Sequence, residues 1–476
     1  MRDKRHWLVE ILVLCLLLGA FAAWKWDLMD RFVGTDAQTD PVAVSPPEGL
    51  DLPSAAAPVQ LAREVTPRAA DPALVASAVQ PLLDRRVLGP RIAVLVQNLS
   101  DGATVFQRGV REFTPASTLK LATATASLST LGEMTRFRTT VKYDAATGAL
   151  TLVGGGDPYL ASTRKKDLQA YPTGGTLAEL TAQVAQVLKD QDQNQVPANG
   201  YTLHVDESLF TGPAISPAWP ANYVPDSVVS PISPLWVDQA RSGFRFASDP
   251  ALQAGQVFRR QLDRAGVPIH GAIHKGPATT AAQEIAGVDS APVGEIVEEM
   301  LAMSDNQAAE VLSRQVGLKA ANDPSFTGGA QAVQQALGSL GVNIGGNNTY
   351  DGSGLSRENR LTAESLAQTI RVAASADHPT LRAAITGVPV AGFTGSLKWR
   401  FVTGPADALG RVRAKTGTLT GVHGLAGVTA AADGTQLVFV MVADRVAPEK
   451  GGLAQQQLDR IAGALGACGC GVGSHP

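Results

Sequence analysis

Residues 114–120 read Thr-Pro-Ala-Ser-Thr-Leu-Lys and place a serine and a lysine three residues apart at the start of an apolar, small-residue segment. The threonine is a preferred helix N-cap and the proline suits the first helical position, so Ser117 is expected in the first turn. Apolar residues then recur near the helical period until Gly132. Residues i and i+3 share a helix face, which predicts the Lys120 ammonium beside the Ser117 hydroxyl.

That proximity has a chemical meaning. A serine hydroxyl is a poor nucleophile until a neighbouring base takes its proton. Lys120 can be that base only where burial or nearby cations lower its pKa, and the positive end of a helix would stabilise negative charge at Ser117. Alone, the pair is weak evidence, because a first-turn serine and a solvated lysine give the same pattern.

A second motif, Ser304-Asp305-Asn306, lies between helices predicted over 292–303 and 308–316. Ser304 could relay a proton between Lys120 and a leaving amine, and the Asn306 amide could bind a substrate amide. A plain N-cap is the alternative, because Ser, Asp and Asn are the preferred capping residues.

A third motif comprises Lys415, Thr416, Gly417 and Thr418, where a predicted strand over 411–416 ends. The lysine supplies a cation, the threonine hydroxyls can bind a carboxylate, and the glycine allows a substrate to approach the strand. A solvated lysine at a strand terminus is the alternative.

The order of elements predicts an α/β (α+β) fold with one antiparallel sheet built from both ends of the chain. An early helix and a hairpin with an Asp-Gly turn match three late strands and a last helix. The predicted elements are 73–88, 92–96, 104–107, 411–416, 421–431, 437–443 and 452–465. The middle of the chain is then an insertion.

Ser-x-x-Lys, Ser-Asp-Asn and Lys-Thr-Gly in this order are the set used by penicillin-binding proteins and class A β-lactamases. Two further features favour one group of proteins within this set. The interval between Ser117 and Ser304 is long, and the chain carries the landmarks 155–158 (Gly-Gly-Asp-Pro) and 351–357 (Asp-Gly-Ser-Gly-Leu-Ser-Arg). The chain resembles the DacB-type D-alanyl-D-alanine carboxypeptidases/endopeptidases, the class C penicillin-binding proteins. The resemblance implies a penicillin-binding/β-lactamase-like transpeptidase domain, its antiparallel sheet flanked by helices, with one inserted mixed α/β domain.

The resemblance also implies domain boundaries. The catalytic domain is expected at 72–140 and 286–467, the inserted domain at 141–285, and a tail at 468–476. The family often carries a second nested insertion, but only a short connection is available for it at 229–244.

Residue roles follow by resemblance. Ser117 would be acylated, Lys120 would be its base, and Ser304 and Asn306 would be the proton relay and the amide clamp. Lys415, Thr416, Gly417 and Thr418 would bind the terminal carboxylate of a peptidoglycan stem peptide. Backbone N–H groups of Ser117 and Thr418 would form the oxyanion hole, and β-lactams would acylate the serine.

Composition, charge and the N-terminal residues limit where the protein is expected in the cell and what it binds. The net charge is −3 with 17% charged residues and no basic run, which argues against nucleic-acid binding. No cofactor or metal is expected. Residues 1–34 carry basic residues before an apolar run and predict an export signal or membrane anchor, cleaved or not, and 35–71 read as a Pro/Ala-rich linker. The protein is therefore expected in the cell envelope, anchored or secreted.

Other interpretations stay open at this point. His423 near the third motif could belong to a Ser-His-Asp hydrolase, although no Gly-x-Ser-x-Gly elbow is present. His270 and His274 could bind zinc, but their extended, glycine-containing context does not favour it. A penicillin-binding sensor without turnover would keep the same pocket. Cys468 and Cys470 could form a bond in an oxidising compartment.

Overall fold

The structure is a computed structural model that describes residues 68–83, 85–164, 171–190, 200–402 and 404–473. The predicted anchor 1–34 and most of the linker 35–71 lie outside the described residues. Within those ranges, no helix has the length and apolarity that crossing a membrane requires.

A five-stranded antiparallel sheet joins the two ends of the chain, as predicted, in the order β12-β13-β14-β1-β2. Ile92 pairs with Ala443, and Asn98 pairs with Leu437, so the first strand lies beside the last. The strands are β1 (Ile92–Asn98), β2 (Thr104–Gly109), β12 (Val412–Leu419), β13 (Val422–Ala430) and β14 (Gln436–Ala443). The predicted fold class is confirmed by this sheet and the helices that cover it.

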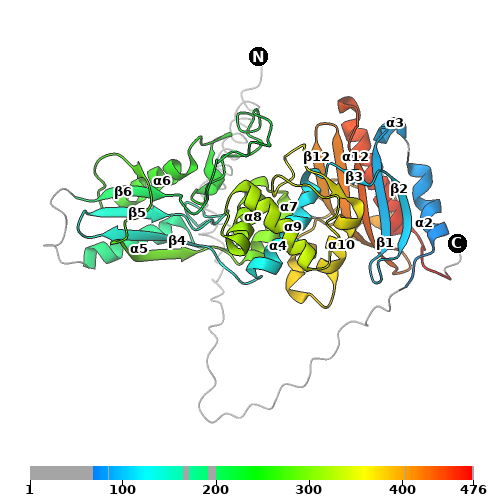
Figure 1. The fold of residues 1–476 in the computed structure, drawn as a ribbon, viewed down its shortest axis with the longest axis horizontal. Coiled ribbons are helices and arrows are strands. Elements are labelled where there is room, and N and C mark those ends of the chain that lie inside the picture. Colours follow the sequence, from blue (N-terminus) through cyan, green and yellow to red (C-terminus); the bar gives the residue numbers. More distant parts are fainter. Residues whose placement is uncertain (1–67, 84, 165–170, 191–199, 403, 474–476) are drawn as a thin grey trace, which may run out of the picture. The chain divides into compact units, whose positions relative to one another are not determined.

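Both faces of this sheet are buried, which explains why its central strands read as continuous apolar runs. Along β1, Ala93 and Leu95 belong to the core beneath one helical layer, and Val94 and Val96 belong to the core on the opposite face. Helices α2 (Pro72–Val79) and α12 (Gly451–Ala467) cover that opposite face (Figure 1).

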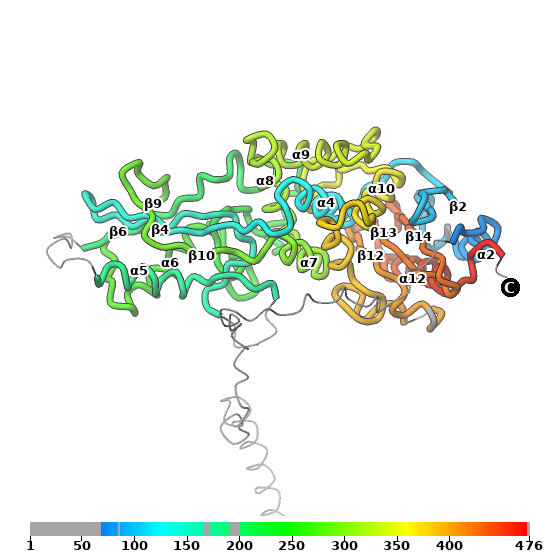
Figure 2. Tube along the Cα trace, turned by 90° about the horizontal axis from the view of Figure 1, so that it is seen from below, coloured from blue at the N-terminus to red at the C-terminus, as the bar shows by residue number. Residues whose placement is uncertain are grey.

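A helical layer packs on the inner face of the sheet and surrounds α4 (Lys120–Leu131), which is buried from Lys120 to Leu128. Figures 1 and 2 show α4 among its helical neighbours. These are α7 (Val293–Met303), α8 (Asn306–Ala321), α9 (Phe326–Ser339), α10 (Ala363–Ala374) and α11 (Ala383–Thr386). A helix buried all round needs small residues for close packing, and α4 is rich in Ala, Ser and Thr.

A second sheet has the order β10-β4-β5-β6-β9 and its own hydrophobic core with α5 (Leu177–Asp190) and α6 (Pro250–Arg264). It is mixed: β5 and β6 are parallel, whereas β4 pairs antiparallel with β5 and β10. Its strands are β4 (Arg138–Asp144), β5 (Ala149–Val153), β6 (Thr202–Asp206), β9 (His274–Lys275) and β10 (Gln283–Asp289). The boundaries predicted for an inserted domain stay a prediction, and β4 and β10 extend a few residues beyond them.

Shorter elements complete the fold. The strands β7 (Arg241–Ser242) and β8 (Arg245–Phe246) form a small hairpin at the end of the connection 229–244 and just beyond it, and β3 (Glu112–Phe113) pairs with β11 (Leu361–Thr362). The 3-10 turns are Gln80–Leu82, Ala116–Leu119, Asp238–Ala240, Pro379–Leu381, Gly395–Leu397, Ala406–Ala408 and Pro448–Lys450.

The ends of the described chain differ from the prediction. The helix expected over 73–88 is broken after Val79 and resumes only as α3 (Arg85–Leu88), because Pro81 cannot donate a helical hydrogen bond. The tail joins the body: Cys468 and Cys470 form a disulfide, and the Asp71 N–H donates to the Cys470 carbonyl at 2.7 Å.

Candidate active site

Ser117 lies in a 3-10 turn, Ala116–Leu119, that runs directly into α4. The prediction that Thr114 caps this helix is wrong. No side chain caps the turn, and the Thr114 hydroxyl accepts a hydrogen bond from Arg360 at 3.1 Å instead. Ala116 has φ +47°, a left-handed conformation that costs an alanine about 1–2 kcal/mol.

Two glycines hold this strained turn in place. A Cβ at Gly354 would lie 1.9 Å from the Ala116 carbonyl oxygen, and one at Gly417 would lie 2.8 Å from the Pro115 carbonyl oxygen. Gly417 was expected to let a substrate approach the strand. In the structure its missing side chain makes room for the turn that carries Ser117, and the expected approach of a substrate stays a prediction.

The Lys120 side chain donates three hydrogen bonds. Its Nζ lies 2.9 Å from Ser117 Oγ, 2.8 Å from Asn306 Oδ1 and 2.7 Å from the Ser353 carbonyl oxygen. The ammonium of a lysine has three donors, so these acceptors saturate it. The first two motifs therefore meet at one nitrogen atom.

Burial sets the acidity of Lys120, which is fully inaccessible to solvent. Desolvation lowers its pKa to about 8, although the carboxylates of Glu310, Asp351 and Asp305 act in the opposite direction. A neutral lysine beside Ser117 is thus accessible near physiological pH.

The turn Ser304-Asp305-Asn306 combines capping with site formation. Ser304 ends α7 with φ +59°, and Asp305 caps α8 by accepting from the Ala308 N–H at 3.0 Å. Asn306 begins α8, and its amide nitrogen donates to the Val228 carbonyl at 3.3 Å. The N-cap interpretation holds for Asp305, while Ser304 and Asn306 contact the two lysines of the site.

Lys415 is the second buried lysine. It is fully buried on β12, and its Nζ donates to Ser304 Oγ at 2.7 Å and to the Thr416 carbonyl at 3.0 Å. Burial holds its pKa well below the usual range, and the cations of Lys120 and Arg400 lower it further. The third motif thereby joins the other two through Ser304.

Backbone groups along β12 face the outer edge of the sheet. The Val412 carbonyl and the Ala414 N–H bond outward to residues 389–391, and β12 is the outermost strand. Outward-facing groups recur every second residue in an antiparallel strand, so the Thr418 N–H faces the same edge. The Thr416 hydroxyl lies 3.1 Å from Ser396 Oγ.

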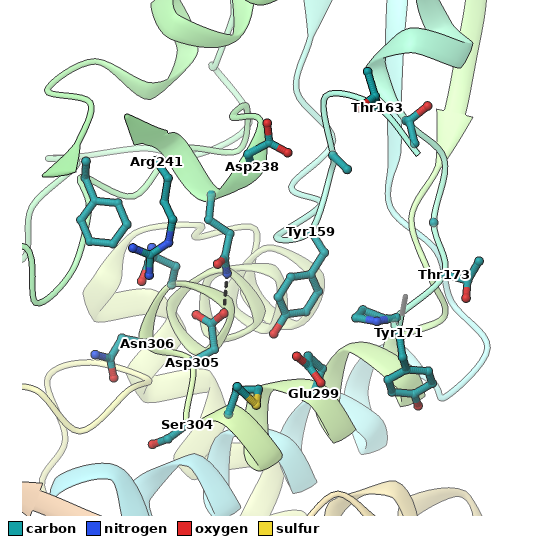
Figure 3. A pocket seen from close by; sticks show the side chains of 18 of the residues that line it. Tyr159, Thr163, Tyr171, Thr173, Asp238, Arg241, Glu299, Ser304, Asp305 and Asn306 are labelled. Carbon is teal, nitrogen blue, oxygen red and sulfur yellow. Dashed lines mark hydrogen bonds between the residues drawn. The ribbon is translucent and has the colours of Figure 1, made fainter. Parts of the chain in front are cut away.

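A cavity of about 700 Å³ adjoins the Ser304-Asp305-Asn306 turn (Figure 3). It is lined further by Tyr159, Tyr171, Asp238, Gln239, Arg241 and Glu299, and Gln239 donates a hydrogen bond to Asp305. Ser117, Lys120 and Lys415 are not among its lining residues. The cavity therefore extends from the site on the side of segments 159–164, 171–176 and 227–246.

The structure gives the other candidate residues different surroundings. His423 is 6% exposed and pairs with Thr418, so its side chain lies on the sheet face opposite Lys415, near Gly451. The His274 ring contacts His204 with centroids 5.3 Å apart. Across the described residues, no three or more His, Cys, Asp or Glu side chains gather where they could hold a metal ion.

Sequence reasoning assigned no role to the groups behind this site. Glu310 and Asp351 are buried carboxylates near Lys120, and Gln239 reaches Asp305 from more than sixty positions earlier in the chain. Glu310 lies one helical turn after Asn306, a spacing that could have drawn attention to it. No local pattern marks Gln239.

Comparisons with known proteins identify the family of the chain. The model of the D-Ala-D-Ala carboxypeptidase 3 (S13) family matches residues 74–247 and 239–465. Carboxypeptidase DacB of Mycolicibacterium smegmatis is 31% identical over 99% of both chains, and the D-alanyl-D-alanine carboxypeptidase of Actinomadura sp. is 30% identical over 76% of this chain and 78% of its own. The crystal structure of penicillin binding protein 4 (dacB) from Haemophilus influenzae covers 81% of this chain and 97% of its own, with TM-score 0.65 and 21% identity, and shows the same fold. This chain belongs to the D-Ala-D-Ala carboxypeptidase 3 (S13) family.

Proposed function

We propose that Ser117 is the nucleophile with which this serine-type D-Ala-D-Ala carboxypeptidase/endopeptidase cleaves cell-wall peptidoglycan stem peptides. One observation carries the proposal. Lys120 Nζ lies 2.9 Å from Ser117 Oγ in a fully buried position where its pKa falls to about 8. A nucleophile and a base at hydrogen-bond distance, with the base near its working protonation state, are what acyl transfer requires.

The proposed acylation begins with neutral Lys120. It takes the Ser117 proton while Oγ attacks the carbonyl carbon before the terminal D-alanine. The C–O bond forms, the C–N bond breaks, and Lys120 returns its proton through Ser304, which Lys415 contacts at 2.7 Å, to the leaving amine. Water then hydrolyses the acyl-enzyme.

The proposed substrate contacts lie at the outer edge of β12, near Thr418. Thr418 and Ser117 N–H groups would stabilise the oxyanion, and Asn306 would bind a substrate amide. Lys415, Thr416 and Thr418 would bind the terminal carboxylate, and the Thr416 hydroxyl is supported by Ser396. A β-lactam would acylate Ser117 in the same geometry.

The place of action follows from the substrate. Peptidoglycan lies outside the cytoplasm, so the catalytic body works in the cell envelope. Residues 1–34, with Arg2, Lys4 and Arg5 before an apolar run, would export the chain and attach it to the membrane.

The experiment is labelling of the purified full chain with a fluorescent penicillin, followed by assay of D-alanine release from a pentapeptide ending in D-Ala-D-Ala. Ser117→Ala should abolish both. Ser127→Ala is the matched control, because Ser127 is buried on the same helix and its hydroxyl donates to the Thr123 carbonyl at 2.7 Å. Labelling that survives Ser117→Ala would refute the assignment, and labelling without D-alanine release would favour a strict endopeptidase or a sensor.

A further inference from the structure

The third acceptor of Lys120 belongs to a peptide group that also contacts a buried carboxylate. The Ser353 carbonyl oxygen accepts from Lys120 Nζ at 2.7 Å. The N–H of the same peptide group, that of Gly354, donates to Asp351 Oδ1 at 3.0 Å. One peptide group therefore separates the base from a carboxylate.

Asp351 is 2% exposed and is held by four donors. Besides the Gly354 N–H, Oδ1 accepts from Asn359 Nδ2 at 2.8 Å, and Oδ2 accepts from the Ser356 N–H at 2.6 Å and from Trp219 Nε1 at 2.9 Å. These four contacts fix the orientation of the Asp351 carboxylate, whose charge acts on Lys120.

Helix α8 also contacts the turn that contains Gly352 and Ser353. Glu310 is fully buried and accepts from the N–H groups of Gly352 at 3.1 Å and Ser353 at 2.8 Å. The Thr123 hydroxyl donates to the Gly352 carbonyl at 2.6 Å, and a Cβ at Gly352 would lie 2.4 Å from Ser313 Cβ. The carbonyl that meets Lys120 has little freedom to move.

Trp219 brings a distant segment of the chain to this charge. It lies in the irregular stretch between β6 and β7, is 6% exposed, and packs edge-on against Phe326 with ring centroids 5.2 Å apart. Its indole N–H therefore reaches Asp351 from a segment more than a hundred residues earlier in the chain.

We propose that Asp351 is a positioning residue that orients the Ser353 carbonyl onto Lys120 and adjusts the proton affinity of that lysine, and that Trp219 moderates the charge of Asp351. This inference rests on the proposed role of Lys120 as the base. A carboxylate on the N–H side of a peptide group polarises its carbonyl oxygen, which stabilises an ammonium on the other side.

Other charged groups also face Lys120. Glu310 approaches from α8, Asp305 from the turn before α8, and Lys415 from β12. Burial raises the pKa of Glu310, and the charge of Asp351 raises it further. Asp351 has four donors and a direct route to Lys120 through one peptide group, so its removal is the most informative change.

The test measures the pH dependence of the second-order rate of acylation by fluorescent penicillin in the full chain. Asp351→Asn removes the charge, so the acidic limb, the pH range over which the acylation rate rises, should move down by about one pH unit. Trp219→Phe removes one donor and leaves the carboxylate less neutralised, so the limb should move up by about half a unit. Opposite shifts are not expected from a merely structural role, which would lower the plateau alone.

Two matched controls isolate the effect. Asp206→Asn changes a buried carboxylate of β6 that accepts from Ser208 and Ala278, and Trp236→Phe removes a buried indole that donates to the Pro158 carbonyl at 3.2 Å. Neither should move the limb.

An unshifted limb in Asp351→Asn would overturn the inference. If that variant does not fold, because the new amide opposes the Trp219 and Ser356 donors, Trp219→Phe decides, and its unshifted limb would overturn it. Absence of wild-type labelling at Ser117 would instead refute the proposed function itself, and this inference with it.

Discussion

Gly354 packs directly on Ala116, the residue that precedes Ser117, and a Cβ at Gly354 would lie only 1.9 Å from the Ala116 carbonyl oxygen. Ala116 has φ +47° and Gly354 has φ +86°, so two left-handed residues meet at the base of the nucleophile turn. The position of Ser117 is thus set by contacts from a segment more than two hundred residues later.

Gly354→Ala should therefore displace the turn and slow penicillin acylation by at least about 100-fold, since misplacement by 1 Å can have that effect. Gly341→Ala is the control: Gly341 also has positive φ, +80°, but its Cβ would meet nothing within 4 Å. The control should lose about 1 kcal/mol of stability and keep its acylation rate. Equal rates in both variants would contradict the proposed contact.

The acylation rate of the wild-type protein should rise with pH. Burial lowers the pKa of Lys120 to about 8, and only the neutral form can accept the Ser117 proton. Below about pH 8 the rate should fall tenfold per unit, and above it the rate should level off. Stopped-flow labelling between about pH 5.5 and 9.5 would measure this, and a rate independent of pH would argue against Lys120 as the base.

Asn306→Asp should move the same limb to higher pH. The new carboxylate would replace the amide oxygen that lies 2.8 Å from Lys120 Nζ, and an opposite charge at that distance favours the ammonium by about one pH unit or more. Asn322→Asp adds the same charge at the far end of α8 and serves as the control. A limb that moves equally in both would point to a general charge effect.

Arg314→Met should destabilise the fold. The buried Arg314 donates to the Pro324 carbonyl at 2.7 Å and the Thr211 carbonyl at 2.6 Å, and lies over the rings of Phe210 and Phe326. Two carbonyls left without donors should cost about 1–3 kcal/mol in the free energy of unfolding.

Urea unfolding would measure that loss, with Arg260→Met, an exposed change on α6, expected within about 0.5 kcal/mol of wild type. If the two variants unfold alike, Arg314 does not secure the Thr211 segment.

Much of the fold can be predicted because its signals are local. The strands β1 and β14 are short continuous apolar runs, and the spacing of Ser117 and Lys120 matches the helical period. The order of the three motifs adds the overall arrangement. The predicted sheet from both ends of the chain, and the family itself, are confirmed by β1–β14 pairing and by the family match.

The remainder depends on contacts that no local pattern encodes. Thr114 is of a residue type preferred at helix N-caps, but the left-handed backbone of Ala116 begins a different turn. Asp238, Gln239 and Ala240 have φ of 51°, 55° and 58°, which their side chains disfavour. Contacts with residues distant in the sequence, such as that of Gln239 with Asp305, are needed to favour these conformations. Local sequence propensity therefore predicts negative φ values at these three residues.

The pairing of Asp71 with Cys470, and of Ala69 with Val472, has a consequence for the topology of the chain. The described part of the chain therefore begins and ends at neighbouring points, so its backbone is nearly a closed ring. A short linker across that gap, with new ends opened at Gly243, where the hairpin turn is open to solvent, would give a circular permutant with the same sheet. Ser117 would then lie mid-chain between two long flanks, with every strand pairing of the first sheet intact.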